Sequence, residues 1–134
     1  MRIFTTRTRV RFAETDKSGI VYYANYFNYF ELGRVALFRD LGLPYVRRVP
    51  IAETHCNFRT SANFGDLLEI RSHIAELRRA GFRIGCEVHR IDESGQAAPT
   101  LLAEGYTGMV TVGDDHRPIP LPDHFRAALE PCLE

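Results

Sequence analysis

The hydrophobic period of the sequence changes near Tyr23, and this change limits the possible folds more than any other feature. Residues 5–13 alternate and are rich in β-forming types, which predicts a strand with Val10 and Phe12 on one face. Residues 23–41 repeat with a helical period instead. The apolar positions of that helix are Tyr26, Phe27, Phe30, Gly33, Leu37, Phe38 and Leu41. So few polar positions remain that the helix must be buried on most of its surface.

Strand-like segments follow the helix at about 52–62, 66–78, 81–91 and 100–112. Short polar or Gly-containing segments separate them, and short turns join antiparallel strands. Five strands and one long helix predict an α+β fold, in which an antiparallel sheet is covered by the helix. Glycines inside the strands indicate close packing over the sheet, and the 23–41 helix is the expected neighbour of Gly85, Gly105 and Gly108.

The end of the chain predicts a short helix over residues 124–129, which Asp123 would cap. No repeat, low-complexity segment or linker interrupts the sequence. We therefore expect a single domain over residues 1–134, long enough to bury a core.

Composition excludes several classes of function. A net charge of zero argues against broad nucleic-acid binding or attraction to membranes. The three cysteines (Cys56, Cys86 and Cys132) fit neither a disulfide framework nor a redox motif, and the five histidines lack ligand spacing, so we expect no metal and no cofactor. No signal peptide or apolar span is visible, and the expected location is the cytoplasm.

An acidic turn, residues 14–19, joins the first strand to the long helix. A carboxylate just before a helix N-terminus can act on a substrate, while unpaired backbone N–H groups there hold a developing negative charge. The alternative is that Asp16 only caps the turn or the helix, as Asp commonly does.

Residues 16–26, with the sequence Asp-Lys-Ser-Gly-Ile-Val-Tyr-Tyr-Ala-Asn-Tyr, resemble the active-site signature of the 4-hydroxybenzoyl-CoA thioesterase-like family of hotdog-fold proteins. Supporting matches follow in register at 30–34, 63–70, 76–82, 102–107 and 118–120. The resemblance implies a hotdog fold, in which a long helix is wrapped by an antiparallel sheet and protomers pair edge to edge. It also implies hydrolysis of an acyl-CoA thioester at the interface between two protomers.

The same resemblance implies roles for four residues around the turn. Asp16 would be the catalytic carboxylate, acting either as nucleophile or as general base. Gly19 would supply the tight turn, and the backbone N–H of Tyr23 would hold the oxyanion. Many family members have His where this chain has Tyr23, which argues against an imidazole acid here and leaves the backbone role intact. The Tyr23 ring itself is expected to pack in the core. Asn25 would brace the loop by hydrogen bonds or simply begin the helix.

Further residues would contact the rest of the substrate. Tyr22, Tyr26, Phe30 and Glu31 are candidates for an acyl pocket, although the default interpretation of the three aromatic rings is core packing and that of Glu31 is an i,i+3 pair with Arg34. Arg78 and Arg79 occupy the position where the family binds CoA phosphates, and paired Arg side chains suit phosphate. Ala80 replaces a Lys found in hydroxybenzoyl-specific relatives.

Three functions remain open from the sequence. The first is an acyl-CoA thioesterase acting on an aromatic or short- to medium-chain acyl group. The second is a thioesterase acting on acyl groups of a carrier protein, and the third is a non-catalytic acyl-CoA-binding or scaffold protein. A hotdog dehydratase fits less well, because Val21 stands where its pattern requires His. In each case we expect a homodimer or a homotetramer of paired dimers, since a lone curved sheet leaves open edges.

Overall fold

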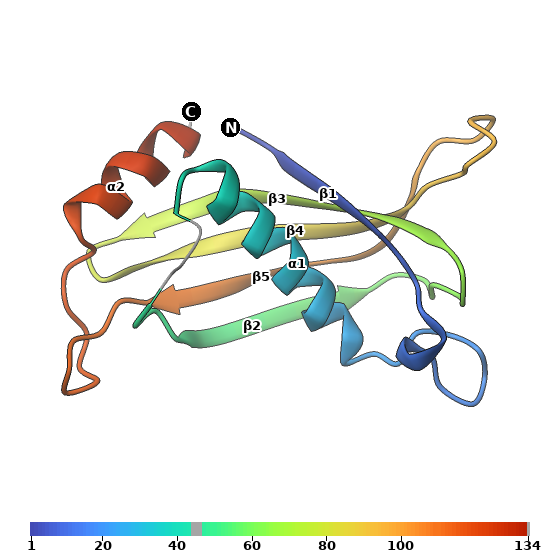
Figure 1. Ribbon diagram of the computed structural model, residues 1–134, viewed down its shortest axis with the longest axis horizontal. Helices are drawn as coiled ribbons and strands as arrows, with labels where there is room; N and C mark the ends of the chain where they lie inside the picture. The colour runs from blue at the N-terminus through green and yellow to red at the C-terminus, as the bar shows by residue number, and fades with distance from the viewer. Residues whose placement is uncertain (44–46, 134) are drawn as a thin grey trace.

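A computed structural model describes residues 1–43 and 47–133 (Figure 1). Its sheet has five strands in the spatial order β1-β3-β4-β5-β2. The strands are β1 (Phe4–Arg9), β2 (Ile51–Phe58), β3 (Leu67–Arg78), β4 (Gly81–Arg90) and β5 (Thr100–Val110). The helical elements are η1 (Phe12–Glu14), α1 (Asn25–Asp40), α2 (Asp123–Leu129) and η2 (Glu130–Leu133).

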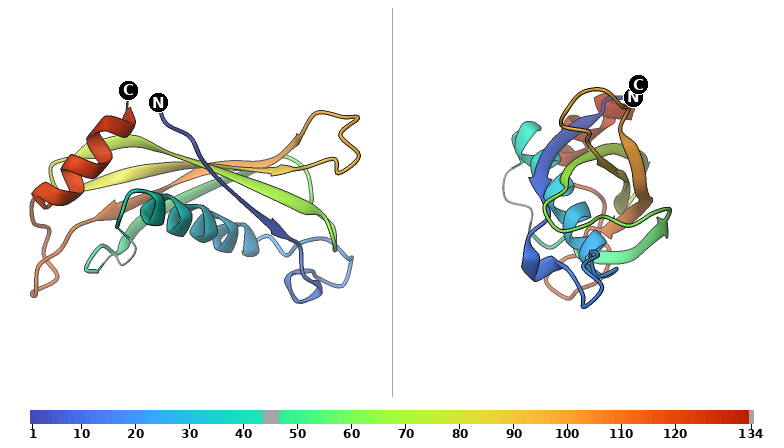
Figure 2. Two further views of the ribbon diagram at one scale, coloured as in Figure 1. Left: turned by 45° about the horizontal axis from the view of Figure 1, so that its top comes forward. Right: turned by 90° about the vertical axis from the view of Figure 1, so that its right-hand side faces the viewer.

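All four strand pairings are antiparallel, so the expected α+β architecture of a five-stranded sheet and a long helix is confirmed. The sheet curves around α1, as the turned views show (Figure 2). The predicted strand and helix positions agree with the structure, but two strands are shorter than predicted. The strand expected over 52–62 ends four residues early, at Phe58, and the strand expected over 5–13 ends at Arg9.

The face of α1 toward the sheet builds two adjoining apolar cores. One core gathers around Tyr29 and Phe30, and the other gathers around Leu37 and Phe38. Between them lies Gly33, where a Cβ atom would stand 2.4 Å from Ser72 Oγ and 2.6 Å from Ile70 Cγ2. The helix backbone therefore sits directly on side chains of β3 at this point.

The first strand is shorter than the sequence pattern predicts. It ends at Arg9, and the chain turns into the 3-10 turn η1. Val10 is buried, but Phe12 is 76% exposed, so the prediction that both share one face is wrong. The physical reason is Glu14, whose carboxylate accepts the Arg11 backbone N–H at 2.9 Å and closes the turn.

The strand glycines do not make room for α1, contrary to expectation. A Cβ on Gly85 would meet the His73 ring at 2.3 Å, and one on Gly105 would meet the His55 carbonyl oxygen at 1.8 Å. These glycines accommodate side chains and backbone of neighbouring strands, because a strand pairs closely with its neighbours on both sides.

The short C-terminal helix is confirmed, but its start is one residue earlier than predicted. Asp123 is the first residue of α2, and Pro122 stands at the cap position without a side-chain hydrogen bond. Proline suits this place because it cannot donate a backbone hydrogen bond, which the first turn of a helix does not need. Within the described residues no helix is long and apolar enough to cross a membrane.

Candidate active site

Residues 15–21, here called the Asp16 loop, form a turn that closes on Asp16. The Asp16 N–H donates to the Ile20 carbonyl at 2.8 Å, and the Gly19 N–H donates to the Asp16 carbonyl at 3.0 Å. Gly19 has φ of 82°, a left-handed conformation that glycine adopts without steric cost. The Ser18 N–H donates to Asp16 Oδ1 at 2.8 Å. The side chain of Asp16 is exposed, and Oδ2 accepts no bond from any residue that the structure describes.

The start of α1 leaves backbone donors unpaired beside this loop. The Tyr22 N–H donates to the Glu14 carbonyl, and the Asn25 N–H donates to the Tyr22 carbonyl, both at 2.9 Å. Between them, the N–H groups of Tyr23 and Ala24 donate to no acceptor within 1–43 and 47–133. Such unpaired groups at a helix N-terminus, with the positive end of the helix dipole, form a site for an anion.

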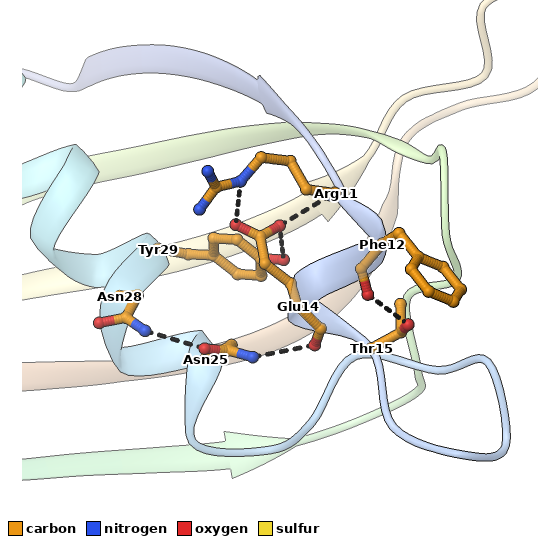
Figure 3. Close-up of polar contacts among 7 residues, drawn as sticks. All are labelled: Arg11, Phe12, Glu14, Thr15, Asn25, Asn28 and Tyr29. Atoms are coloured by element: carbon orange, nitrogen blue, oxygen red, sulfur yellow. Dashed lines mark hydrogen bonds and ion pairs between the residues drawn. The ribbon is translucent and has the colours of Figure 1, made fainter.

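Asn25 connects the loop to the helix (Figure 3). Its Nδ2 donates to the Glu14 carbonyl at 2.9 Å, and its Oδ1 accepts from Asn28 Nδ2 at 2.9 Å. The predicted bracing contact is therefore present in the structure. The amide reaches back to the residue that precedes the Asp16 loop.

A cavity of about 340 Å³ opens between the Asp16 loop, the start of α1 and the end of β2. Its lining residues are Asp16, Ile20, Val21, Tyr22, Tyr23, Tyr26, Phe58, Arg59, Thr60 and Ser61. Phe58 faces two of the tyrosines edge-on, with ring centroids 6.2 Å from Tyr23 and 5.4 Å from Tyr26. The lining therefore combines Asp16, which has an exposed carboxylate, and Tyr23, which has an unpaired N–H, with aromatic side chains.

The aromatic candidates separate into buried and exposed rings. Tyr26 and Phe30 are buried, as the default interpretation predicts, and the Tyr26 hydroxyl accepts the Ala62 N–H at 3.1 Å. Burial raises the pKa of Tyr26. Tyr22 and Tyr23 are 48% and 59% exposed, so the expectation of core packing is wrong for both. Their rings stand at the mouth of the cavity because the chain leaves the sheet here.

Two predicted pocket residues lie elsewhere in the protomer. Phe30 is a residue of α1 whose side chain lies in the core, and it does not line the cavity. Glu31 lies in a separate groove of about 400 Å³ with Val35 and Phe38. Its carboxylate is 4.0 Å from the guanidinium of Arg34, which confirms the predicted i,i+3 pair.

Arg78 and Arg79 lie at the opposite end of the sheet from Asp16. They stand at the turn between β3 and β4, whereas the Asp16 loop contacts the chain just before β3. β3 has 12 residues, and a strand of this length spans about 36 Å at ~3.3 Å per residue. The structure therefore confirms the predicted turn but does not bring both sites together within one protomer.

Several residues of the site were not predicted from the sequence. The cavity is also lined by Phe58, Arg59, Thr60 and Ser61. The Glu14 carbonyl accepts hydrogen bonds from Asn25 and Tyr22 beside it. The Arg11–Glu14 spacing of three residues could have indicated a capped turn. The segment 58–61 carries no such signal, because only the folded sheet brings it beside Asp16. No cluster of three His, Cys, Asp or Glu side chains that could hold a metal occurs among the described residues.

Known thioesterases are similar in sequence to this chain over most of its length. An acyl-CoA thioesterase, YbgC, from Helicobacter pylori is 29% identical over 135 residues, which cover 92% of this chain and 97% of that protein. The 4-hydroxybenzoyl-CoA thioesterase of Pseudomonas sp. strain CBS-3 is 28% identical over 112 residues, or 77% of this chain and 79% of that protein.

Solved structures agree with the sequence relatives. A 4-hydroxybenzoyl CoA thioesterase mutant complexed with 4-hydroxybenzoyl CoA superimposes with a TM-score of 0.85 and 26% identity, covering 96% of this chain and 99% of that one. A family model described as the thioesterase-like superfamily matches residues 10–129. This match, together with the long helix and the five-stranded sheet, shows that the chain belongs to the thioesterase-like superfamily.

Proposed function

We propose that this protein hydrolyses acyl-CoA thioesters, with Asp16 and the backbone N–H of Tyr23 at the reacting carbonyl. One observation carries the proposal: Asp16, with its exposed carboxylate, and Tyr23, with its unpaired N–H, line the same cavity. The relatives named acyl-CoA thioesterases and 4-hydroxybenzoyl-CoA thioesterase support the same reaction.

The chemistry requires a nucleophile and a site for the oxyanion. Asp16 either attacks the thioester carbonyl carbon or takes a proton from a water that attacks it. The carbonyl oxygen gains negative charge, which the Tyr23 N–H and the N-terminal end of α1 stabilise. The carbon–sulfur bond then breaks, and the sulfur leaves as CoA thiolate, which takes up a proton. In the nucleophilic route, water finally hydrolyses the anhydride and restores the Asp16 carboxylate.

The cavity favours an acyl group that is aromatic or of short to medium length. Its walls carry the rings of Tyr22, Tyr23 and Phe58, which suit a planar or apolar group. Arg78 and Arg79 are proposed to bind the CoA phosphates, and Glu31 is proposed to contact the far end of the acyl group. Because both sites lie away from Asp16 in one protomer, each would act in a partner protomer's active site.

Replacement of Asp16 by Asn tests the proposal directly. We expect kcat to fall by about 100- to 10,000-fold, the usual range for losing a positioned acid–base group. The measurement is hydrolysis of benzoyl-, 4-hydroxybenzoyl-, butanoyl- and octanoyl-CoA by the purified protein. Unchanged hydrolysis by Asp16→Asn would contradict the assigned role.

The chain contains a matched control for this variant. Asp92 and Gly95 repeat the Asp-x-Ser-Gly pattern of Asp16 and Gly19, with two hydrogen bonds in common. The Ser94 N–H donates to Asp92 Oδ1 at 3.1 Å, and the Gly95 N–H donates to the Asp92 carbonyl at 3.0 Å. The Asp92 carboxylate also accepts from Ser94 Oγ and the Ala97 N–H. Asp92→Asn therefore perturbs a similar turn outside the cavity, and we expect it to leave kcat unchanged.

Two other functions give different results in the same assay. A thioesterase for carrier-protein substrates would hydrolyse an acyl group faster on the carrier protein than on CoA. A scaffold protein would bind acyl-CoA without turnover, and Asp16→Asn would then change nothing. The exposed carboxylate beside free backbone donors favours hydrolysis over both binding alone and a structural turn.

A further inference from the structure

We propose that Glu14 is a positioning residue, which holds the Asp16 loop at a fixed place against the start of α1. The inference rests on the function proposed above and adds a residue to it. Glu14 stands outside the cavity and does not line it. Its effect on the reaction would pass through the loop and the helix that it joins.

The side chain of Glu14 joins three parts of the chain (Figure 3). Oε1 accepts the Tyr29 hydroxyl at 2.9 Å and the Arg11 backbone N–H at 2.9 Å. Oε2 accepts Arg11 Nε at 3.2 Å. The Glu14 side chain is only 14% exposed, and Tyr29 is 1% exposed. A buried carboxylate with this many donors holds its position well.

Tyr29 makes the contact rigid, because it belongs to the core. Its ring faces the Tyr26 ring edge-on, with centroids 5.7 Å apart. Tyr29 lies in the second turn of α1, so its hydroxyl links the body of the helix to η1. Burial, followed by the hydrogen bond to Glu14, raises the pKa of Tyr29, so the phenol keeps its proton and donates it.

The main chain of Glu14 holds the other side of the loop. Its carbonyl accepts both the Tyr22 N–H and Asn25 Nδ2, each at 2.9 Å. Glu14 precedes the Asp16 loop, and Tyr22 follows it. One residue therefore fixes both ends of the loop and the start of the helix. The relative position of Asp16 and the Tyr23 N–H depends on that junction.

Without the Glu14 carboxylate, the Asp16 loop would keep its internal hydrogen bonds but would lose its fixed position against α1. The turn of Asp92 to Gly95 has the same Asp-x-Ser-Gly bonds, so the turn itself needs only local contacts. Without the carboxylate, the buried Tyr29 hydroxyl loses its acceptor, and η1 loses one of the bonds that close it, while the Glu14 N–H still donates to the Arg11 carbonyl. A displacement of about 1 Å between reacting groups can lower a rate about 100-fold.

Three variants test the inference on the acyl-CoA panel. Glu14→Ala should lower kcat by about 100-fold with KM nearly unchanged, because substrate contacts remain while the reacting groups move apart. Glu14→Gln should keep most of the activity, since the amide oxygen accepts the bonds from the Arg11 N–H and the Tyr29 hydroxyl, and only the bond from Arg11 Nε is lost. Tyr29→Phe should lower kcat less than Glu14→Ala does, because the Arg11 bonds stay.

Glu69 supplies a matched control on the other face of the sheet. Its side chain is also 14% exposed, and it forms ion pairs with Arg7 at 3.0 Å and Arg71 at 2.9 Å. Its sequence neighbours Leu68 and Ile70 point into the core, so Glu69 faces away from α1. Glu69→Ala removes an equally buried carboxylate, and we expect it to leave kcat unchanged.

Amide hydrogen exchange separates the failure of this inference from failure of the proposed function. Glu14→Ala should speed exchange of the Tyr22 amide while exchange in β3 and β4 stays at the parent level. A parent protein that hydrolyses no thioester would refute the proposed function. Parent-like kcat in Glu14→Ala, an equal loss in Glu14→Gln, or unchanged Tyr22 exchange would each overturn the positioning role.

Discussion

At the scale of single residues, Asp16 and Asp92 occupy similar turns in different surroundings. Both occur in Asp-x-Ser-Gly turns with the same backbone bonds. Asp92 lies in the loop between β4 and β5, whereas Asp16 lies beside the free N–H groups that begin α1. The catalytic role proposed for Asp16 therefore rests on its neighbours and not on its own turn.

Cys86 gives a residue-scale prediction about alkaline stability. The thiol is buried beneath α1, and burial raises its pKa to about 12 despite a contact with Ser72 Oγ at 3.7 Å. In the unfolded chain a thiol ionises near pH ~8.5. Above that pH the unfolded state loses a proton that the folded state keeps, so stability falls as pH rises toward 12.

The measurement is the urea midpoint of the parent and of Cys86→Ala between pH 7 and pH 11. The variant should be less stable at neutral pH, because it leaves a small cavity, but its stability should decline less above about pH 8.5. Below about pH 8 the two curves should run parallel, because the thiol is protonated in both states. Curves that stay parallel up to pH 11 would refute the prediction.

At the scale of elements, the contact of α1 with β3 depends on Gly33. Alanine in a helix interior is favoured over glycine by about 1 kcal/mol. Here a Cβ would lie 2.4 Å from Ser72 Oγ and 2.6 Å from Ile70 Cγ2. Overpacking of this kind costs about 1–3 kcal/mol, so Gly33→Ala should lower the free energy of unfolding.

Chemical denaturation of a double-mutant cycle checks the origin of that loss. Ser72→Ala removes the nearer of the two atoms, and combining it with Gly33→Ala should recover part of the loss. Val35→Ala is the control, because Val35 lies on the same helix but is 43% exposed. It should change stability by no more than about 0.5 kcal/mol. Strictly additive effects in the cycle would show that Ser72 does not cause the clash.

At the scale of the whole molecule, β2 is an edge strand, and most of its residues are exposed. We expect two copies to pair along β2, because an open edge strand offers unpaired backbone groups and a two-fold axis makes the pairing antiparallel. The Ile51 end of one β2 would then lie beside the Phe58 end of the other. This pairing would place the Arg78–Arg79 turn of one protomer at the Asp16 end of its partner.

Mixing two defective variants tests this arrangement. One variant carries Asp16→Asn, and the other carries Arg78→Ala with Arg79→Ala. Each mixed dimer should contain one intact site, so exchange of subunits should restore activity above that of either variant alone. The control places all three substitutions in one chain and mixes it with the Asp16→Asn variant, which leaves no complete site.

Sedimentation measures the assembly independently of activity. The parent should sediment at twice or four times the protomer mass of 15.3 kDa. A monomer at assay concentration would contradict the dimer and the shared site together. A dimer without recovered activity would contradict only the placement of the Arg pair.

The sequence by itself determined the elements and the position of the Asp16 loop. The period change near Tyr23 predicts α1, and short turns predict the antiparallel strands, because both signals are local in the chain. The resemblance in residues 16–26 assigned the Asp16 loop from a local motif. Local patterns also explain the errors: alternation continues past Arg9, but Glu14 closes a turn there.

Only the tertiary structure decided which distant residues meet at that loop. Phe58 to Ser61 join Asp16 because β2 ends beside α1, and Glu14 meets Tyr29 across 15 positions of the chain. The same fold separates Arg78 and Arg79 from Asp16, although the sequence assigns them to one substrate. Hydrophobic periodicity reports which face of an element is buried, but neighbours across a sheet follow from strand order and register.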